Sequence, residues 1–480
     1  MTEKGILKKI SDVQWEIGRD FRSDMRVPAR VFASEKMIAD ISRDRSLGQL
    51  VNVATLPGIQ IAAIAMPDIH EGYGFPIGAV AATEWPDGVI SPGGIGYDIN
   101  CGVRLLRSDL MLADVEPHLA RLADEIARAV PSGVGRTGRL SLDVEDLDAV
   151  LRDGIDWALR EGYANKDDRE NIESNGHLTN ADPIYVSLHA KKRGSEQLGT
   201  MGSGNHFVEV DYVEKVFDQD IADAFGVQEG RVLVQIHCGS RGLGHQVATD
   251  YIKVMIECMQ GYGITIPDRE LACAPLSSPE GQAYFNAMAA AANFAWANRQ
   301  IIAWEVRNEW SRIFGESENL ATLYDVAHNI AKIEEHQVDG VKKKLILHRK
   351  GATRAFGPGH PELPLHYRET GQPVAIPGSM GTASYVLAGA REAMAQSFGS
   401  CCHGAGRRLS RHAAKKEIGG KTLLEQLKAS GIAVRAGSLA DLAEEAPLAY
   451  KDVNGVVDVV HKAGLARKVA CLKPLSVVKG

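Results

Sequence analysis

The chain reads Val232-Leu233-Val234-Gln235-Ile236-His237-Cys238-Gly239-Ser240-Arg241-Gly242 near its midpoint. The apolar run over 232–236 predicts a buried strand, and the glycines after it predict a turn. The strand ends in His237, and Arg241 follows in the glycine-bracketed loop. A lone histidine in this position is more often a hydrogen-bonded core residue than a ligand. The stretch therefore indicates a β-strand and leaves the role of its histidine open.

Strands and helices are mixed irregularly along the rest of the chain. Apolar runs predict strands at 61–66, 77–82, 103–106, 320–326, 344–347, 373–376 and 383–387, with an extended tail at 467–479. Helical spacing predicts helices at 112–129, 142–160, 403–416, 440–447 and 452–462, and a long amphipathic helix at 287–314. The polar stretch 165–190 is expected to be exposed. Because regular βαβ alternation is absent, we expect an α+β fold with one large domain over 1–480 and a helical insertion at about 110–200.

Composition excludes several classes of protein. The 480 residues include 54 basic and 61 acidic side chains, a formal net charge of −7, which excludes a uniformly basic nucleic-acid coat but not a local basic groove. No apolar run reaches the ~18 residues of a membrane span, and the first residues lack a signal peptide. The seven cysteines are an odd number, and only Cys401 and Cys402 lie close together. This pattern favours free thiols and a reducing, cytoplasmic location.

A glycine-dense turn over 93–102 presents a carboxylate, Asp98, and a thiol, Cys101. Both can reach one metal ion and a thiolate can bridge two, although a buried structural cysteine is the plainer alternative. Three histidines stand beside short apolar runs: His206, His237 and His328. Imidazole, carboxylate and thiolate together suit zinc or another borderline transition ion, and a pair of ions would suit phosphoryl transfer. The spacings are too long for a zinc-finger pattern.

A second candidate centre is His403, which stands in Cys401-Cys402-His403-Gly404-Ala405-Gly406. The small neighbours leave the ring accessible, and the helix predicted to begin there would offer an anion site at its N-terminus. His403 is therefore a candidate nucleophile towards a phosphate, the alternative being a histidine without chemistry. Basic residues in nearby loops are candidate phosphate ligands, although such residues usually form a solvated face: Arg241, Lys350, Arg354, Arg407, Arg408 and Arg411.

Several motifs occur in order along the chain: Pro67-Asp68-Ile69-His70-Glu71-Gly72-Tyr73-Gly74-Phe75-Pro76-Ile77-Gly78, the turn at 98–101, Gly204-Asn205-His206, His237-Cys238-Gly239-Ser240-Arg241-Gly242 and His403-Gly404-Ala405-Gly406-Arg407. Together they resemble the RtcB family of RNA ligases, from about residue 25 to the end. The resemblance implies mixed sheets around a central cleft for metal and nucleotide. It also implies GTP-dependent joining of RNA ends with a 2′,3′-cyclic phosphate or 3′-phosphate to 5′-hydroxyl ends, in tRNA splicing or RNA repair, with a pair of Mn²⁺ ions.

The same resemblance implies roles for individual residues. His403 would become guanylylated, with Asp68 supporting the site from behind. The metal ligands would be Asp98, Cys101, His206, His237 and His328, with Cys101 bridging. The guanine nucleotide would contact Asn205, Glu209, Asn329, Ser379, Ser384, Gly404, Ala405, Gly406, Tyr450 and Lys479. Phosphates of the RNA would contact Arg241, Lys350 and Arg411.

Two other functions compete with this interpretation: a metal-dependent phosphoesterase acting on RNA ends, and a non-catalytic RNA-binding protein with a structural metal. The expected partners are RNA and GTP, with an archease-like activator protein as a further candidate. We expect a monomer that does not associate with a membrane.

Overall fold

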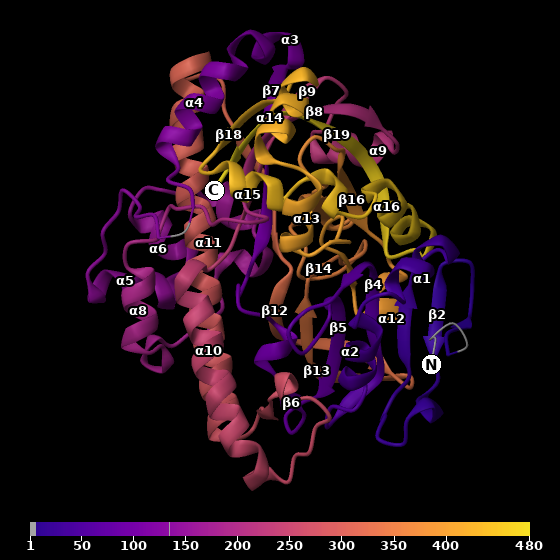
Figure 1. The fold of residues 1–480 in the computed structure, drawn as a ribbon. Coiled ribbons are helices and arrows are strands. Elements are labelled where there is room, and N and C mark those ends of the chain that lie inside the picture. The colour runs from indigo at the N-terminus through magenta and orange to yellow at the C-terminus, as the bar shows by residue number, and fades with distance from the viewer. Residues whose placement is uncertain (1–5, 134) are drawn as a thin grey trace.

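The computed structural model describes residues 6–133 and 135–480, so the first residues, on which the expectation of no signal peptide depends, lie outside it. The fold is α+β, as predicted, and is built around two large mixed sheets (Figure 1). The first sheet has the order β1 (Lys8–Lys9), β2 (Gln14–Ile17), β3 (Ala29–Phe32), β4 (Ile59–His70), β5 (Ile77–Glu84), β13 (Val341–Lys350) and β12 (Asn329–Val338).

The second sheet has the order β11 (Ala321–Ala327), β7 (Gly102–Met111), β9 (Arg231–Cys238), β8 (Phe207–Val216), β19 (Ala466–Lys479), β16 (Ser384–Gly389) and β15 (Pro373–Ile376), and β18 (Ala433–Ala436) pairs with β19. Two small sheets pair β6 (Val89–Ile90) with β10 (Ala274–Pro275) and β14 (Ala352–Arg354) with β17 (Ser400–Cys402). All of the strands predicted from apolar runs are present, because buried strands carry the clearest apolar signal.

Four neighbouring strands of the second sheet meet at one edge. The order β11-β7-β9-β8 is antiparallel throughout, so β7 and β8 start where β9 and β11 end. The register pairs Gly102 with Cys238 and with Ala327, and it pairs Phe207 with His237. The strand ends therefore bring together side chains that are far apart in sequence.

The helices cover the sheets, and several of them pack against one central helix, α11 (Pro279–Phe314). They are α1 (Glu35–Ile41), α2 (Ser46–Val53), α3 (Leu112–Val115), α4 (Leu119–Ala129), α5 (Val144–Asp153), α6 (Ile155–Arg160), α7 (Lys166–Glu170), α8 (Leu188–Gly194), α9 (Gln219–Phe225), α10 (Arg241–Cys258), α11 (Pro279–Phe314), α12 (Ala393–Ser397), α13 (Arg411–Glu417), α14 (Gly420–Ala429), α15 (Leu439–Glu444) and α16 (Val453–Lys462). Figure 1 shows α10 and α11 as a long column beside α5, α6 and α8. No helix among the described residues has the length and apolar character needed to cross a membrane.

The central helix α11 differs from the amphipathic helix expected at 287–314. It begins earlier, at Pro279, and its middle turns are buried on every side. The reason is that α4, α5, α6, α10 and β9 all pack against it. Alanines in these turns allow close approach, and polar residues among them are buried as well: Asn293, Asn298, Arg299 and Gln300.

Three other predictions are wrong. The stretch 165–190 is not an exposed excursion, because Asp168 and Glu173 are buried in ion pairs with Arg307 and Lys332. No helix covers 403–410, because Gly406 adopts a left-handed φ of 72° and α13 begins only at residue 411. Arg241 does not lie in a loop but is the first residue of α10. The division of 110–200 from the rest of the domain stays a prediction.

Candidate functional site

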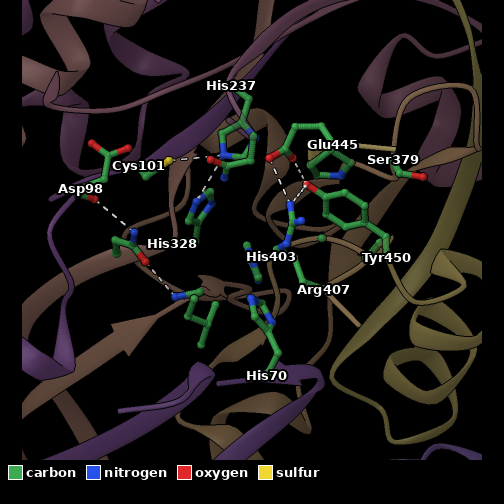
Figure 2. Close-up of a pocket in the computed structure, with 18 of the residues that line it drawn as sticks. His70, Asp98, Cys101, His237, His328, Ser379, His403, Arg407, Glu445 and Tyr450 are labelled. Atoms are coloured by element: carbon green, nitrogen blue, oxygen red, sulfur yellow. Dashed lines mark hydrogen bonds and ion pairs between the residues drawn. The ribbon is translucent and has the colours of Figure 1, made fainter. Parts of the chain in front are cut away.

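Metal donors gather at the edge where the four antiparallel strands meet. Cys101 Sγ lies 3.3 Å from His206 Nε2 and 3.3 Å from His237 Nε2. His237 Nε2 lies 3.4 Å from His328 Nε2, and His206 Nε2 lies 2.8 Å from Asp98 Oδ2. The predicted ligands therefore form two groups of three that share Cys101. Figure 2 shows Cys101, His237 and His328 converging from different segments.

The donor set fits a transition-metal ion. Burial lowers the pKa of His237 and of His328 well below the usual value, so both imidazoles are neutral, which is the form that binds a metal. Burial and then the neighbouring Asp98 raise the pKa of the Cys101 thiol to about 12, so the thiolate needs a cation beside it. Two donor groups with one shared sulfur match a thiolate-bridged pair of ions.

A cavity of about 310 Å³ adjoins these donors. This volume is typical of a small-molecule site. Most of the predicted site residues line it, namely Asp98, Cys101, Asn205, Glu209, His237, His328, Asn329, Lys350, Ser379, His403, Gly404, Ala405, Gly406, Arg411, Tyr450 and Lys479. The structure therefore brings the candidate nucleophile, the metal donors and the glycine-rich loops into one cleft, as Figure 2 shows for its labelled members.

His403 follows β17 and is held by Asp68 at the end of β4. One carboxylate oxygen, Asp68 Oδ2, accepts hydrogen bonds from the His403 backbone N–H (2.9 Å) and from Nδ1 (2.5 Å). In the neutral form of the ring, Nδ1 carries the proton and donates it to the carboxylate, so Nε2 carries the free lone pair. The His403 ring centroid lies 5.0 Å from that of the metal donor His328. The accessible nitrogen is thus placed beside the donor cluster.

Asp68 is itself fixed by its surroundings. Burial alone would raise the pKa of Asp68, but the charge and hydrogen bonds of His403 hold it below its usual value. Lys451 donates to the backbone carbonyls on either side, those of Pro67 (3.2 Å) and Ile69. Gly406 packs so closely on the Asp68 carbonyl that a Cβ there would collide with it. Lys451 was not predicted, because it lies outside every motif.

Another part of the cavity lining carries a charged and aromatic cluster. Arg407 Nη1 donates to Glu445 Oε1 (3.1 Å) and to the Tyr450 hydroxyl (3.2 Å), and its guanidinium lies 5.0 Å from the centre of the Tyr450 ring. Glu209 and Lys479 line the same cavity. Burial and Asp211 raise the pKa of Glu209 well above its usual value. Glu445 was not predicted, because it lies in an alanine- and glutamate-rich segment that carries no motif.

Two residues predicted to contact the ligands, Lys350 and Ser384, form hydrogen bonds with the protein backbone instead. Lys350 lines the cavity, but its ammonium donates to the backbone carbonyls of Tyr73, Phe75 (3.1 Å) and Gly93 (3.1 Å). Burial lowers the pKa of Lys350 to about 7. Ser384 is buried behind the loop and accepts from the Gly378 N–H at 3.1 Å. These two residues are therefore placed to hold loops in position.

A second, more basic cavity of about 500 Å³ is lined by Asp98 and His206. Arg241 contributes to its wall and is held by the Thr200 hydroxyl (3.1 Å) and the Gly133 carbonyl (3.1 Å). Three further cations line this cavity and were not predicted as site residues: Arg136, Lys192 and Arg193. They lie within the stretch expected as an insertion, where no motif marks them.

The α+β fold, the thiol-centred donor cluster and the adjacent histidine together are typical of a metal-dependent enzyme of phosphoryl transfer. Residues 49–480 match the family described as tRNA-splicing ligase RtcB. Proteins named tRNA-splicing ligase RtcB are similar over the whole length: that of Archaeoglobus fulgidus is 55% identical, covering 100% of both chains, and that of Thermococcus kodakarensis is also 55% identical, covering 100% of both. The protein of that name in Aeropyrum pernix is 53% identical, covering 98% of this chain and 99% of its own.

The chain therefore belongs to the tRNA-splicing ligase RtcB family, a family of RNA ligases. Membership agrees with the resemblance carried by the motifs. The seven cysteines are all free, which agrees with the predicted absence of a disulfide framework.

Proposed function

We propose that this protein joins RNA ends that carry a 3′-phosphate or 2′,3′-cyclic phosphate to RNA ends that carry a 5′-hydroxyl, with GTP as co-substrate. The observation that carries the proposal is the free Nε2 of His403, which lies in a nucleotide-sized cavity beside two groups of metal donors. Two Mn²⁺ ions, held by Asp98, Cys101, His206, His237 and His328, would supply charge stabilisation for the phosphate oxygens.

In the first step, His403 Nε2 attacks the α-phosphorus of GTP. A P–N bond forms, the α–β phosphoanhydride bond breaks, and pyrophosphate leaves. Asp68 accepts the Nδ1 proton in a hydrogen bond, so it stabilises the positive charge that develops on the ring. A 2′,3′-cyclic phosphate end is first hydrolysed by water, which breaks the bond to the 2′-oxygen and leaves a 3′-phosphate. The 3′-phosphate of the RNA then attacks the guanylylated histidine, forming an RNA–GMP anhydride and freeing His403. Finally the 5′-hydroxyl displaces GMP and the phosphodiester is complete.

The remaining wall of the cavity would hold the nucleotide. Glu209 and Asn205 offer acceptors and donors for a base edge, and Tyr450 offers a ring beside the Arg407 guanidinium. Ser379 and Lys479 line the same cavity, and the Gly404-Ala405-Gly406 backbone lies next to the nucleophile. We include Asn329 in this set because it lines the cavity beside Asp98.

The basic second cavity would hold RNA phosphates. Its four cations line it together with Asp98 and His206, whereas His403 lines the first cavity. Guanidinium groups bind phosphate in a bidentate way, and Arg241 is fixed in place by two hydrogen bonds. Arg411, which lines the nucleotide cavity and is half exposed, would contribute a further phosphate contact. The physiological substrate would be split tRNA or damaged RNA.

The competing function, a metal-dependent phosphoesterase acting on RNA ends, would use the same metal donors but would form no covalent bond between the protein and a nucleotide. Incubating the protein with Mn²⁺ and GTP, followed by intact mass spectrometry and peptide mapping, separates the two. We expect an added GMP on His403, its absence in His403→Ala, and an unchanged adduct in His412→Ala, which removes an exposed histidine of α13. A His403→Ala variant that still takes up GMP would disprove the assigned nucleophile. Absence of any adduct in the wild type would favour the phosphoesterase.

A further inference from the structure

Arg299, in the middle of α11, contacts the backbone of two separate segments that carry metal donors. Its side chain is completely buried and pairs with Asp325 on β11, Nη2 lying 2.7 Å from Oδ1. Nη1 donates to the carbonyls of Asn100 (2.7 Å) and Cys238 (2.9 Å). Nη2 also donates to Asn100 Oδ1 at 3.1 Å. One guanidinium therefore joins the residue before Cys101, the residue after His237, and the strand β11, which ends immediately before His328.

The neighbouring Asn298 contacts the same region from the next position of the helix. Its Nδ2 donates to the carbonyls of Thr200 (3.1 Å) and Gly239 (3.2 Å) and lies 3.3 Å from Cys238 Sγ. Its Oδ1 accepts from the N–H groups of Gly199 (2.8 Å) and Thr200 (3.2 Å). Thr200 in turn accepts from Arg241. Two of the buried polar residues at the centre of this helix thus contact the turns of the donor cluster.

The turn before Cys101 needs such support. Asn100 has a left-handed φ of 53°, a conformation that is uncommon outside glycine and that asparagine adopts more readily than most residues. Its amide nitrogen donates back to the Ala292 carbonyl of α11 at 2.7 Å, so both ends of the Asn100 side chain are held by this helix. On the other turn, a Cβ at Gly239 would collide with the Asp98 carboxylate. The spacing of the donors therefore depends on how closely α11 holds these two turns.

We propose that Arg299, assisted by Asn298, is a positioning residue that sets the spacing of the metal donors Cys101, His237 and His328. This inference rests on the metal centre proposed above. The planar, always charged guanidinium reaches both carbonyls and Asp325 at once, which a lysine ammonium on a flexible stem does not reproduce. Residues that orient metal ligands from behind change metal affinity by about 10- to 100-fold when they are replaced.

A matched control exists in the same ion-pair cluster. Arg104 on β7 is also completely buried and also pairs with Asp325, at 2.8 Å from Oδ2. Its other hydrogen bond goes to Gln300, and among the described residues it makes none to Asn100 or Cys238. A role in fold stability alone would make Arg299→Lys and Arg104→Lys equivalent, whereas a positioning role separates them.

The experiment is a titration of the metal-free full-length variants with Co²⁺, followed by the thiolate-to-cobalt charge-transfer absorption, with bound Mn²⁺ measured separately by elemental analysis. Circular dichroism and thermal unfolding in chelator report the fold. We expect Arg104→Lys to bind Co²⁺ within about twofold of wild type, although its unfolding temperature falls. We expect Arg299→Lys to bind at least about tenfold more weakly, with a diminished thiolate band.

Equal affinities for the two variants would overturn the inference. If Arg299→Lys does not fold, Asn100→Gly decides, since glycine accepts the left-handed backbone and removes only the side-chain hydrogen bonds to α11, those with Arg299 and with the Ala292 carbonyl. Weaker Co²⁺ binding by that variant supports the inference, and unchanged binding overturns it. A wild type that binds neither ion would refute the metal centre itself, a result distinct from equal binding by the variants.

Discussion

Asp68→Asn removes the carboxylate behind His403 with almost no change in shape. In the wild type, Asp68 Oδ2 accepts from Nδ1 at 2.5 Å and from the backbone N–H of His403 at 2.9 Å. An asparagine oxygen can still accept, but it carries no charge to stabilise a cationic ring. The other oxygen, Oδ1, is buried and has no hydrogen-bond partner among the described residues, so an amide placed there would be unpaired as well.

The size of the effect follows from the charge that is removed. A hydrogen bond to a charged group contributes about 1.5–3 kcal/mol. Since about 1.4 kcal/mol corresponds to a tenfold change in rate, formation of the guanylylated histidine should slow by about 10- to 150-fold. The stability of the variant should fall by about 1–3 kcal/mol, because one buried amide group lacks a partner.

The assay is single-turnover transfer of labelled GMP from GTP to the protein, with metal content measured on the same samples. The control is Glu334→Gln, which removes a buried carboxylate paired with Arg349 away from the cavity. We expect this control to lose stability and to keep the wild-type rate of adduct formation. An Asp68→Asn variant that forms the adduct at the wild-type rate would refute the role assigned to the Asp68–His403 hydrogen bond.

Other substitutions test the metal bridge, the RNA cavity and a buried ion pair. Cys101→Ala should lose bound Mn²⁺, because both donor groups share this sulfur, and an undiminished Mn²⁺ content by elemental analysis would disprove the bridge. Arg241→Ala should weaken RNA binding and reduce the slope of log K against log salt by about 0.7 for each RNA phosphate that the variant no longer neutralises, whereas an unchanged slope would place the RNA elsewhere. Asp168→Asn should cost about 3 kcal/mol at pH 7 by chemical denaturation, because it breaks a buried pair with Arg307. Burial would raise the pKa of Asp168, but Arg307 holds it below the usual 3.8, so the wild type loses its advantage as the pH falls below that value, and a difference independent of pH would contradict this.

Much of the fold was predictable because its strands are buried. Continuous apolar runs marked β4, β5, β7, β9 and β16, which lie inside the two sheets, and β11, which is an edge strand but is buried almost throughout. The strand β12 was missed because it alternates polar and apolar residues as the edge strand of its sheet, and such a pattern is weaker over a short stretch. The helix α10 was missed because its first turn contains glycines, which usually indicate loops. The central part of α11 was misjudged because burial on all sides removes the apolar periodicity of a surface helix.

The residues of the functional site likewise divide into those that the sequence predicted and those that it did not. Its donors and nucleophile stand in glycine-rich motifs, since turns and close approaches need glycine, and these were found from the sequence. Residues that hold the donors or complete the walls stand outside such motifs. Glu445 and Lys451 reach the site only through the packing of the C-terminal segment, and Arg299 reaches it from the centre of a helix. Positions of this kind depend on tertiary contacts that short motifs do not record.

His328 marks the point at which the chain crosses between the two sheets. β11 ends at Ala327 in the second sheet, and β12 begins at Asn329 in the first. The Asn329 side chain links the turn that carries Asp98 to the residue that follows β13. Its Nδ2 donates to the Asp98 carbonyl (3.1 Å) and its Oδ1 accepts from the Gly351 N–H (2.8 Å). Asp68 lies near the end of β4 in the first sheet and orients His403, whereas Cys101, His206 and His237 stand at or next to strand ends of the second. The distance between nucleophile and metal donors is therefore set by the packing of the two sheets across this crossover, which is why spacing along the sequence does not record it.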